Sequence, residues 1–571
     1  MSREQSFMKA AFFGVVADDL VFPFPSLGEA EAKQMRALSK GIAQALADHD
    51  PAQLDSDRDI PAPLLDKLRA AGAFGIHLPK AVGGAGLSVF GATRIAQGVA
   101  ELDPAVALML LTHGAMGARA IDAFGSEAQK ARHLPELASG RSIAAFALTE
   151  HSSGSDAATI RTQAMWDEAD GRFKLDGEKP WVSNGSIADV FAVFARTNRA
   201  DEGHKPALTG FIVPAAAGVS VGEQHRTLGV RGLSVAPVRF DQVPIDRDQV
   251  LGEVGRGYRV AMGVLNDARI SLAAFSFGQA RAILQRIIQH VGHRRSFGRA
   301  IGEFPIIKDK IAKMMADCYA VESMVYLTAG LVDRKVEDYS LESAICRVAS
   351  VESLWRVVNE ALQVVAGRGY VEGGGFERAL RDARVGFVID GTNETLRCFI
   401  ALSGLRGPGE RLEVESALLE PLKGFGLLRR FAPRKVREAL RRERIARAHP
   451  LLSREAVFFE EAVAEFHEAS MRALREHGRE IAEMQYTQKR LANAAIDLYA
   501  LAACLSRTSL AIESRGESGA RREIDLTTMF ASAANGRMRA HLRRLEHNDD
   551  ELRKLIAART YTDAGYPFDV L

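Results

Sequence analysis

The chain lacks the cysteine and histidine patterns that organise metal sites and disulfide frameworks. It has 4 cysteines in 571 residues, and no two of them form a Cys-x-x-Cys pair. The 14 histidines are not spaced as ligands beside cysteine or glutamate, and no His-Glu-x-x-His motif occurs. We therefore expect no metal site and no disulfide framework, which suits a reducing compartment.

Nucleotide-binding and hydrolase motifs are missing as well. There is no Walker A sequence and no Gly-x-Ser-x-Gly elbow, and the glycines at 367–375 do not form Gly-x-Gly-x-x-Gly after a strand. The formal net charge is only +2, which argues against a globally basic protein and against a nucleic-acid partner. These absences remove several common enzyme and binding classes from consideration.

Long hydrophobic runs are also absent. Nowhere do about 18 apolar residues follow one another without interruption, so we expect no transmembrane helix. The short apolar run at 10–17 is followed by two aspartates and lacks a small-residue cleavage site, so we interpret it as a docking segment and not a signal peptide. We expect a cytoplasmic protein that can lie at the periphery of the inner membrane.

The rest of the sequence changes texture in blocks, and 571 residues are too many for one hydrophobic core. Residues 30–145 are rich in Ala, Leu and Glu and predict helices. Residues 143–255 show short apolar–polar alternations between Asp-Gly and Asn-Gly turns, which predict a small barrel or two packed sheets. Helical periodicity returns at Gly257 and persists.

Three long helical segments follow the β block, over about 257–292, 305–334 and 341–366, and they favour an antiparallel bundle. The character shifts again after Gly409, where further helices are expected. The fold class is therefore an α+β multidomain protein. Its predicted parts are an N-terminal α-helical domain (1–145), a middle β-barrel domain (146–256), a four-helix bundle (257–408) and an additional C-terminal α-helical domain (409–571).

Residues 421–448 form a basic segment within the last domain. Their Lys and Arg side chains are interleaved with Leu, Phe, Val and Ile. A basic amphipathic stretch can lie on an anionic membrane surface, but a solvated basic helix or linker has the same composition. The sequence leaves both interpretations open.

The stretch Val388-Ile389-Asp390-Gly391-Thr392-Asn393-Glu394 places a carboxylate on an Asp-Gly turn directly before an apolar, helix-like run. Taken alone it is an ordinary structural turn, with Thr392 or Asn393 as the N-cap of the next helix. The functional interpretation is a catalytic base held on a rigid corner beside a cofactor. Only the rest of the chain can decide between the two.

Two polar segments could serve a cofactor. Residues 149–156 offer backbone N–H groups and hydroxyls suited to phosphate oxygens or ring heteroatoms, although a surface loop has the same composition. Trp181 and Ser183 lie on one face of a predicted strand, where they could stack on and hydrogen-bond an aromatic ring, or be a core Trp beside a turn. Small residues between Gly114 and Ala120 either permit close helix packing or leave room for a ligand.

Taken in order, these motifs resemble the acyl-CoA dehydrogenase family of flavoproteins. The matching segments are 147–150 with Gly154-Ser155-Asp156, then 181–185, 294–298, 363–369 and Asp390-Gly391-Thr392. Phe22-Pro23-Phe24-Pro25, Leu498-Tyr499-Ala500 and the extra helical region resemble the very-long-chain branch and its relative that serves respiratory complex I assembly. The resemblance covers nearly the whole chain.

This resemblance implies an FAD cofactor bound across a subunit boundary, and hence at least a homodimer. Within one subunit the implied FAD contacts are Phe146, Leu148, Thr149, Ser155, Trp181 and Ser183. Those that would reach the FAD of the neighbouring subunit are Arg294, Phe297, Gln363 and Gly367. Thr392 and Glu394 would lie near the other end of the cofactor.

The implied reaction converts a fatty acyl-CoA to its trans-2-enoyl-CoA and passes electrons to an electron-transferring flavoprotein. Asp390 would take the α proton while a β hydride leaves to flavin N5. A backbone N–H at the base, next to Gly391, and a flavin ribityl hydroxyl would polarise the thioester carbonyl. Asn266 and Arg269 match the helix that lines the acyl-CoA site. Substrate binding would expel water and make the carboxylate more basic.

The small residues Gly117 and Ala120 match small residues of the very-long-chain branch. Small side chains at the floor of the pocket would leave a deep cavity, so we expect a medium or long acyl chain.

The chain departs from the family pattern at the base itself, where Glu is usual. Asp390 is one methylene shorter, about 1.5 Å less reach. Ala268 stands where some branches carry a relocated Glu, and the neighbouring Asp267 should point elsewhere. Either the backbone brings Asp390 closer, or the enzyme is slow or takes an unusual substrate, or the chain is a catalytically weak, membrane-associated scaffold. Nitroalkane oxidases of the same superfamily use Asp, so a flavoprotein oxidase of a small carbon acid is the alternative enzyme.

Overall fold

The computed structural model describes residues 6–198, 207–419 and 444–569, which form two compact units. Apart from the extreme N-terminus, the first unit is Pro23–Leu396, and the second combines Gln5–Phe22 with Arg397–Leu571. The predicted domain 1–145 therefore differs from the structure at its start, because the N-terminal segment belongs to the C-terminal unit. The boundary between the units also lies at 396, before the predicted 408.

The first unit begins with short helices whose starts are set by proline and capping side chains. Asp50 accepts a hydrogen bond from the Ala52 N–H, and Asp103 does the same for Val106, each just before a proline-led helix. These helices pack into one apolar core with the following β domain. They are α3 (Glu29–Leu46), α4 (Pro51–Asp57), α5 (Ala62–Ala70), α6 (Val89–Leu102), α7 (Pro104–Leu111), the π-helical segment η3 (Thr112–Ala118), α8 (Arg119–Phe124) and α9 (Glu127–Ser139).

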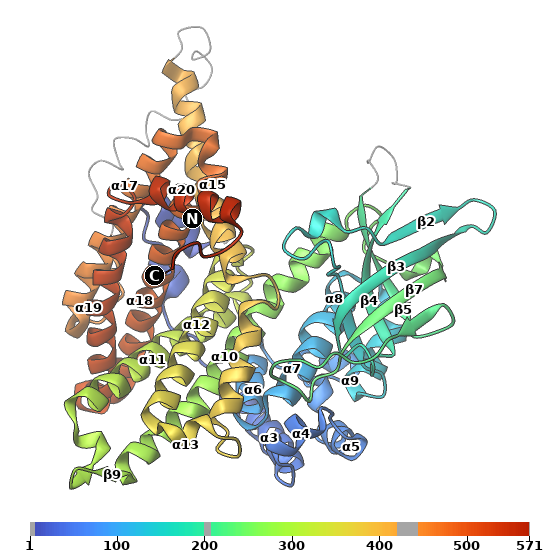
Figure 1. Ribbon diagram of the computed structural model, residues 1–571, viewed down its shortest axis with the longest axis horizontal. Coiled ribbons are helices and arrows are strands. Elements are labelled where there is room, and N and C mark those ends of the chain that lie inside the picture. Colours follow the sequence, from blue (N-terminus) through green and yellow to red (C-terminus); the bar gives the residue numbers. More distant parts are fainter. Residues whose placement is uncertain (1–5, 199–206, 420–443, 570–571) are drawn as a thin grey trace. The chain divides into compact units, whose positions relative to one another are not determined.

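The middle domain is one eight-stranded sheet in the order β6-β7-β3-β2-β4-β5-β8, with β1 parallel to β4 (Figure 1). Among the described strands, β6 and β8 at the ends of this path are very short and do not pair with each other. The β domain that the sequence predicted between the helical parts is confirmed. The strands are β1 (Ala144–Ala147), β2 (Gln163–Asp167), β3 (Arg172–Ser183), β4 (Val190–Thr197), β5 (Leu208–Pro214), β6 (Val219–Val221), β7 (Val235–Ile245) and β8 (Val250–Leu251).

Strand β4 lies at the centre and is buried on both faces. Phe191 and Val193 join the core of the β domain, whereas Ala192 and Phe194 join the core shared with the helices. A strand buried on both sides needs a continuous apolar run, which is what the sequence supplies there. The sheet is thereby fixed to the helical layer.

The long helices of the bundle closely match their predicted ranges. They are α10 (Gly257–His293), α11 (Pro305–Asp333) and α12 (Ser340–Val365), with α6 packed along α10. Short elements follow: the hairpin strands β9 (Arg295–Ser296) and β10 (Arg299–Ala300) after α10, then α13 (Gly367–Tyr370), α14 (Phe376–Ala383) and η7 (Arg384–Phe387) after α12. The last long helix, α15 (Asn393–Leu419), starts directly after the Asp-Gly turn.

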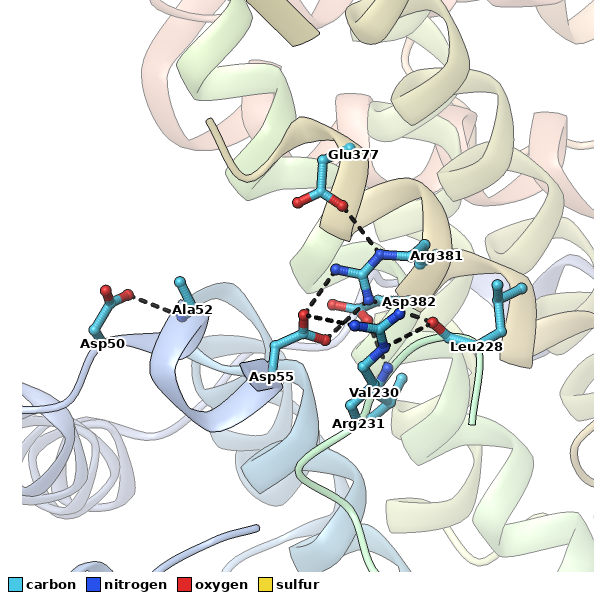
Figure 2. Close-up of polar contacts among 9 residues, drawn as sticks. All are labelled: Asp50, Ala52, Asp55, Leu228, Val230, Arg231, Glu377, Arg381 and Asp382. Carbon is cyan, nitrogen blue, oxygen red and sulfur yellow. Dashed lines mark hydrogen bonds and ion pairs between the residues drawn. The ribbon is translucent and has the colours of Figure 1, made fainter. Parts of the chain in front are cut away.

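A cluster of charged side chains joins the three domains of the first unit (Figure 2). The Asp55 carboxylate on α4 accepts two hydrogen bonds from Arg381 on α14, at 2.9 and 2.8 Å. Arg231, in the loop before β7, lies 3.7 Å from the same carboxylate. The buried Asp382 accepts the Val230 N–H of that loop. The cluster therefore ties the β domain to the helices on either side of it.

The second unit is built from α17 (Ser453–His477), α18 (Gln485–Gly519), α19 (Arg521–Arg543) and α20 (Asp550–Asp563). The N-terminal helices α1 (Phe7–Phe12) and α2 (Asp18–Val21) pack on them. The Phe7 ring lies 6.1 Å from that of Tyr499, and Phe12 meets Phe466 edge-on at 4.6 Å. The predicted docking segment thus docks within its own chain. Most of the basic segment 421–448 lies outside the described residues.

Within the described ranges, three helical stretches are long and apolar enough to cross a membrane by length and composition alone. They are Pro104–Phe124, Gly257–His293 and Gln485–Gly519, and most of each is buried inside the protein. Burial in the core therefore accounts for their apolar character. None of the three is an uninterrupted apolar run.

Candidate active site

The Asp-Gly turn adopts a conformation that most residues avoid. Asp390 has φ +59° and Gly391 has φ +85°, so both lie in the left-handed region, which residues other than Gly, Asn and Asp rarely adopt. The turn ends at Thr392, whose hydroxyl accepts the Thr395 N–H at 3.2 Å and caps α15, as predicted. Two successive left-handed residues need support from the surrounding structure.

Arg347 on α12 supplies that support. Its side chain is fully buried, and its guanidinium donates hydrogen bonds to the carbonyls of Ile389 and Gly391, the second at 2.8 Å. It also donates to the side-chain oxygen of Asn393, and that amide donates in turn to Glu352 at 3.1 Å. Both carbonyls that flank Asp390 are therefore held by one arginine.

The Asp390 carboxylate is buried yet not engaged in hydrogen bonds. The side chain is 2% exposed, and in the part of the chain that the structure describes neither of its oxygens has a hydrogen-bond donor. Arg269 on α10 is its ion partner, with 3.5 Å between Nε and Oδ2. Burial raises the pKa of Asp390 to about 6, against the opposing pull of Arg269 and Arg347. At neutral pH the group is a carboxylate whose lone pairs remain free to accept a proton.

The neighbouring carboxylate on α10 faces a different direction, as predicted. Asp267 accepts a hydrogen bond from Arg119 at 2.8 Å and another from the Tyr339 hydroxyl. Asn266 instead accepts from Arg269 at 2.8 Å. Asp267 is thus committed to its own ion pair, which leaves Asp390 as the carboxylate of this corner.

One predicted cofactor loop reaches the same corner. A hydrogen bond of 3.2 Å between the hydroxyls of Thr395 and Ser155 brings the loop after β1 to the start of α15. Trp181 lies near the end of β3 with half of its surface exposed, and the buried Val182 between them places Ser183 on the same side. An exposed indole face beside several hydroxyls and backbone N–H groups suits a large aromatic cofactor that carries phosphates, such as FAD.

Known protein families match consecutive parts of the chain. The N-terminal, middle and C-terminal domains of acyl-CoA dehydrogenases match residues 29–141, 145–243 and 255–405. The ACAD9/ACADV C-terminal domain matches residues 450–564. The very long-chain specific acyl-CoA dehydrogenases of Rattus norvegicus and Homo sapiens are each 35% identical, over 96% and 95% of this chain and over 86% and 85% of their own lengths. The chain belongs to the acyl-CoA dehydrogenase family.

Solved structures of the family have the same fold. An acyl-CoA dehydrogenase from Bacillus anthracis, complexed with FAD, superposes with a TM-score of 0.82 at 25% identity and covers 98% of this chain and 96% of its own. Butyryl-CoA dehydrogenase from Megasphaera elsdenii gives a TM-score of 0.63 at 28% identity. It covers 67% of this chain and all of its own, so the additional C-terminal region is what distinguishes this chain from it.

Four residues expected to reach a neighbouring subunit's FAD are solvent-exposed in the single chain. Phe297 is 93% exposed, at φ +51° in the β9–β10 hairpin. Arg294, Gln363 and Gly367 are exposed as well. This exposure is compatible with a covering partner, and their role stays a prediction. Within the single subunit, Phe146 packs on Phe194 at 5.0 Å, and Leu148 is buried.

The helix expected to floor the acyl pocket packs closely on the sheet. A side chain at Gly117 would meet the Ala144 side chain of β1 at 2.6 Å, and Ala120 is fully buried. Small residues here permit close packing of η3 on β1, which was one of the two interpretations of the sequence. A deep cavity at Gly117 and Ala120 stays a prediction.

Two buried cations beside the site, Lys179 and Arg347, were not predicted from the sequence. Lys179 on β3 is fully buried and donates to the Leu148 carbonyl at 2.9 Å and to Glu150 at 2.8 Å. The Glu150 carboxylate also accepts the N–H groups of Arg161 and Thr162. This pair fixes the backbone on both sides of Thr149. For Arg347, the only feature of the sequence that indicates a buried role is its position as a lone arginine inside an apolar run.

Proposed function

We propose that this protein is an FAD-dependent fatty acyl-CoA dehydrogenase in which Asp390 removes the substrate's α proton. The observation that carries the proposal is the buried Asp390 carboxylate, which has no hydrogen-bond donor among the described residues and lies beside Arg269. Family membership and the names of the relatives support the reaction class. Thr149, Ser155, Trp181 and Ser183 would hold FAD, which supplies the acceptor for the β hydride.

The turn can perform two parts of the chemistry. The carboxylate accepts the α proton, and its raised pKa makes it a stronger base than an ordinary aspartate. Among the described residues, the backbone N–H of Asp390 has no acceptor, so it is available to polarise a thioester carbonyl. Both groups belong to one residue, which fixes them relative to each other when the carbonyl binds.

The two arginines favour the charge that develops during proton transfer. Once Asp390 takes the proton it becomes neutral, and negative charge moves to the thioester enolate. The guanidinium groups of Arg269 and Arg347 then face a substrate anion in a buried setting, where electrostatic stabilisation is strong. This electrostatic setting supports the proposal that Asp390 acts as the base.

The substrate is proposed to be a medium- or long-chain acyl-CoA. The names of the relatives specify very long chains, and this supports the proposal. We further propose a homodimer that passes electrons to an electron-transferring flavoprotein. The exposed Phe297 hairpin supports the dimer, since it offers an aromatic side chain that a second subunit would cover.

The test is to purify the protein, measure bound flavin, and supply acyl-CoAs of graded chain length with a dye acceptor. We expect turnover that rises with chain length and is lost in Asp390→Asn. An optimum at four carbons would contradict the chain-length proposal. Oxygen consumption with nitroalkanes but not with thioesters would instead identify an oxidase, and a flavin that no thioester reduces would identify a scaffold.

A further inference from the structure

We propose that Arg347 is a positioning residue for proton abstraction: by binding the carbonyls on both sides of Asp390, it sets the direction in which the carboxylate points. The inference rests on the proposed role of Asp390 as the base. Arg347 lies on α12, more than forty positions before Asp390 in the sequence, and it does not need to touch substrate.

The planar guanidinium of Arg347 donates hydrogen bonds to three acceptors of the turn. One terminal nitrogen donates to the Asn393 side chain, and the other donates to the carbonyls of Ile389 and Gly391. Arginine is suited to this task because its N–H groups are coplanar and spaced to meet several acceptors at once. A lysine would carry the same charge on a single nitrogen and could not hold all three acceptors in this geometry.

An aspartate depends on its backbone more than a glutamate would. Its carboxylate follows the Cα after one methylene group, so two side-chain torsions separate it from the backbone, and its aim is set largely by the turn. The turn holds Asp390 and Gly391 in two successive left-handed conformations, at φ +59° and +85°, which need support from the surrounding structure. Misplacement of a reacting group by about 1 Å can lower a rate by on the order of 10²-fold. Loosening these two carbonyls would therefore reduce proton abstraction more than substrate binding.

The positive charge of Arg347 also lowers the pKa of Asp390, and this electrostatic effect can be separated from the positioning of the turn. The charged groups around the turn are Arg269 from α10, Arg347 and Glu352 from α12, and Glu394 from α15. Arg347→Lys keeps the positive charge and removes the fork, so it tests geometry. Arg347→Met removes both. If Arg347 acted through its charge alone, Arg347→Lys would behave as wild type.

The measurement is exchange of α protons in D₂O, using an acyl-CoA in which sulfur replaces the β methylene. This analogue can lose an α proton but cannot be dehydrogenated, so the readout isolates the base. We expect Arg347→Lys to lower the exchange rate by about 10²-fold, with unchanged affinity for the analogue and an acid limb near that of wild type. Arg347→Met should lower the rate further and move the acid limb to higher pH.

Arg356→Met is the matched control on the same helix, since Arg356 pairs with Asp317 at 3.0 Å on the surface. It should exchange at the wild-type rate with the same flavin content. Wild-type exchange in Arg347→Lys would overturn the inference, and this variant decides alone if Arg347→Met does not fold. Asp390→Asn separates the two proposals: if it exchanges as fast as wild type, the proposed base is wrong, whereas lost exchange leaves the Arg347 result decisive.

Discussion

Replacing Arg269 by glutamine should move the acid limb of the pH–rate profile upward. Arg269 Nε lies 3.5 Å from Asp390 Oδ2, and both side chains are buried. At an effective dielectric constant of about 20, Coulomb's law gives about 5 kcal/mol for unit charges at this distance. Both charges are delocalised, so their effective separation is longer, and an adjacent arginine typically lowers an aspartate pKa by about 1–3 units.

The expected pKa of Asp390 in Arg269→Gln is therefore about 7–9, compared with about 6 in the wild-type protein. The base must be ionised to accept a proton, so activity is lost as the pH falls through its pKa. A shift of two units would leave about a tenth of the base ionised at pH 7, and kcat/KM would fall about tenfold. The loss should nearly disappear at about pH 9–10, where the base is ionised again.

The assay is kcat/KM for one long-chain acyl-CoA against pH, because this ratio reports ionisations of the free enzyme. Arg119→Gln is the matched control, since Arg119 pairs with Asp267 and Asp122 and is not an ion partner of Asp390. An acid limb that stays near 6 in Arg269→Gln would refute the electrostatic reasoning. A deficit that persists undiminished at high pH would show that Arg269 acts through substrate contacts instead.

Two predictions concern stability. Lys179→Met leaves Glu150 buried without its cation and should lower the free energy of unfolding by about 3–5 kcal/mol in denaturant titrations. Lys174 pairs with Asp167 at the surface, so Lys174→Met should cost much less, and equal losses would contradict the buried-pair account. Burial raises the pKa of Asp382 to about 6, so its contribution to stability is present below about pH 4 and is lost as the pH rises through 6. Asp382→Asn should flatten the dependence of stability on pH over this window and add up to about 3 kcal/mol at pH 7, whereas a wild-type slope would count against it.

Local patterns in the sequence predicted the elements that depend on local physics. The three bundle helices start and end close to their expected residues, because long runs without internal proline define them and Pro305 opens α11. The Thr392 cap and the placement of Trp181 and Ser183 on one face also follow from local rules. The motif order then located the candidate base.

Pairings between distant residues could not be predicted in this way. Arg347 contacts a turn more than forty residues away, and Lys179 lies 29 residues from Glu150. Buried contacts of this kind have no periodic signature, since each depends on one charged side chain and a partner far away in the sequence. The N-terminal segment was assigned to the first domain for the same reason. Its neighbours in the fold, Phe459, Phe466 and Tyr499, lie more than 400 residues later in the sequence.

The central claim is that Asp390 is the base, and single-turnover reduction of the bound flavin tests it most directly. Wild type and Asp390→Asn, matched for flavin content, are mixed anaerobically with a long-chain acyl-CoA while flavin absorbance is followed. The account predicts that the reduction rate falls by about 10²–10⁴-fold in Asp390→Asn. Reduction at the wild-type rate in Asp390→Asn would contradict it.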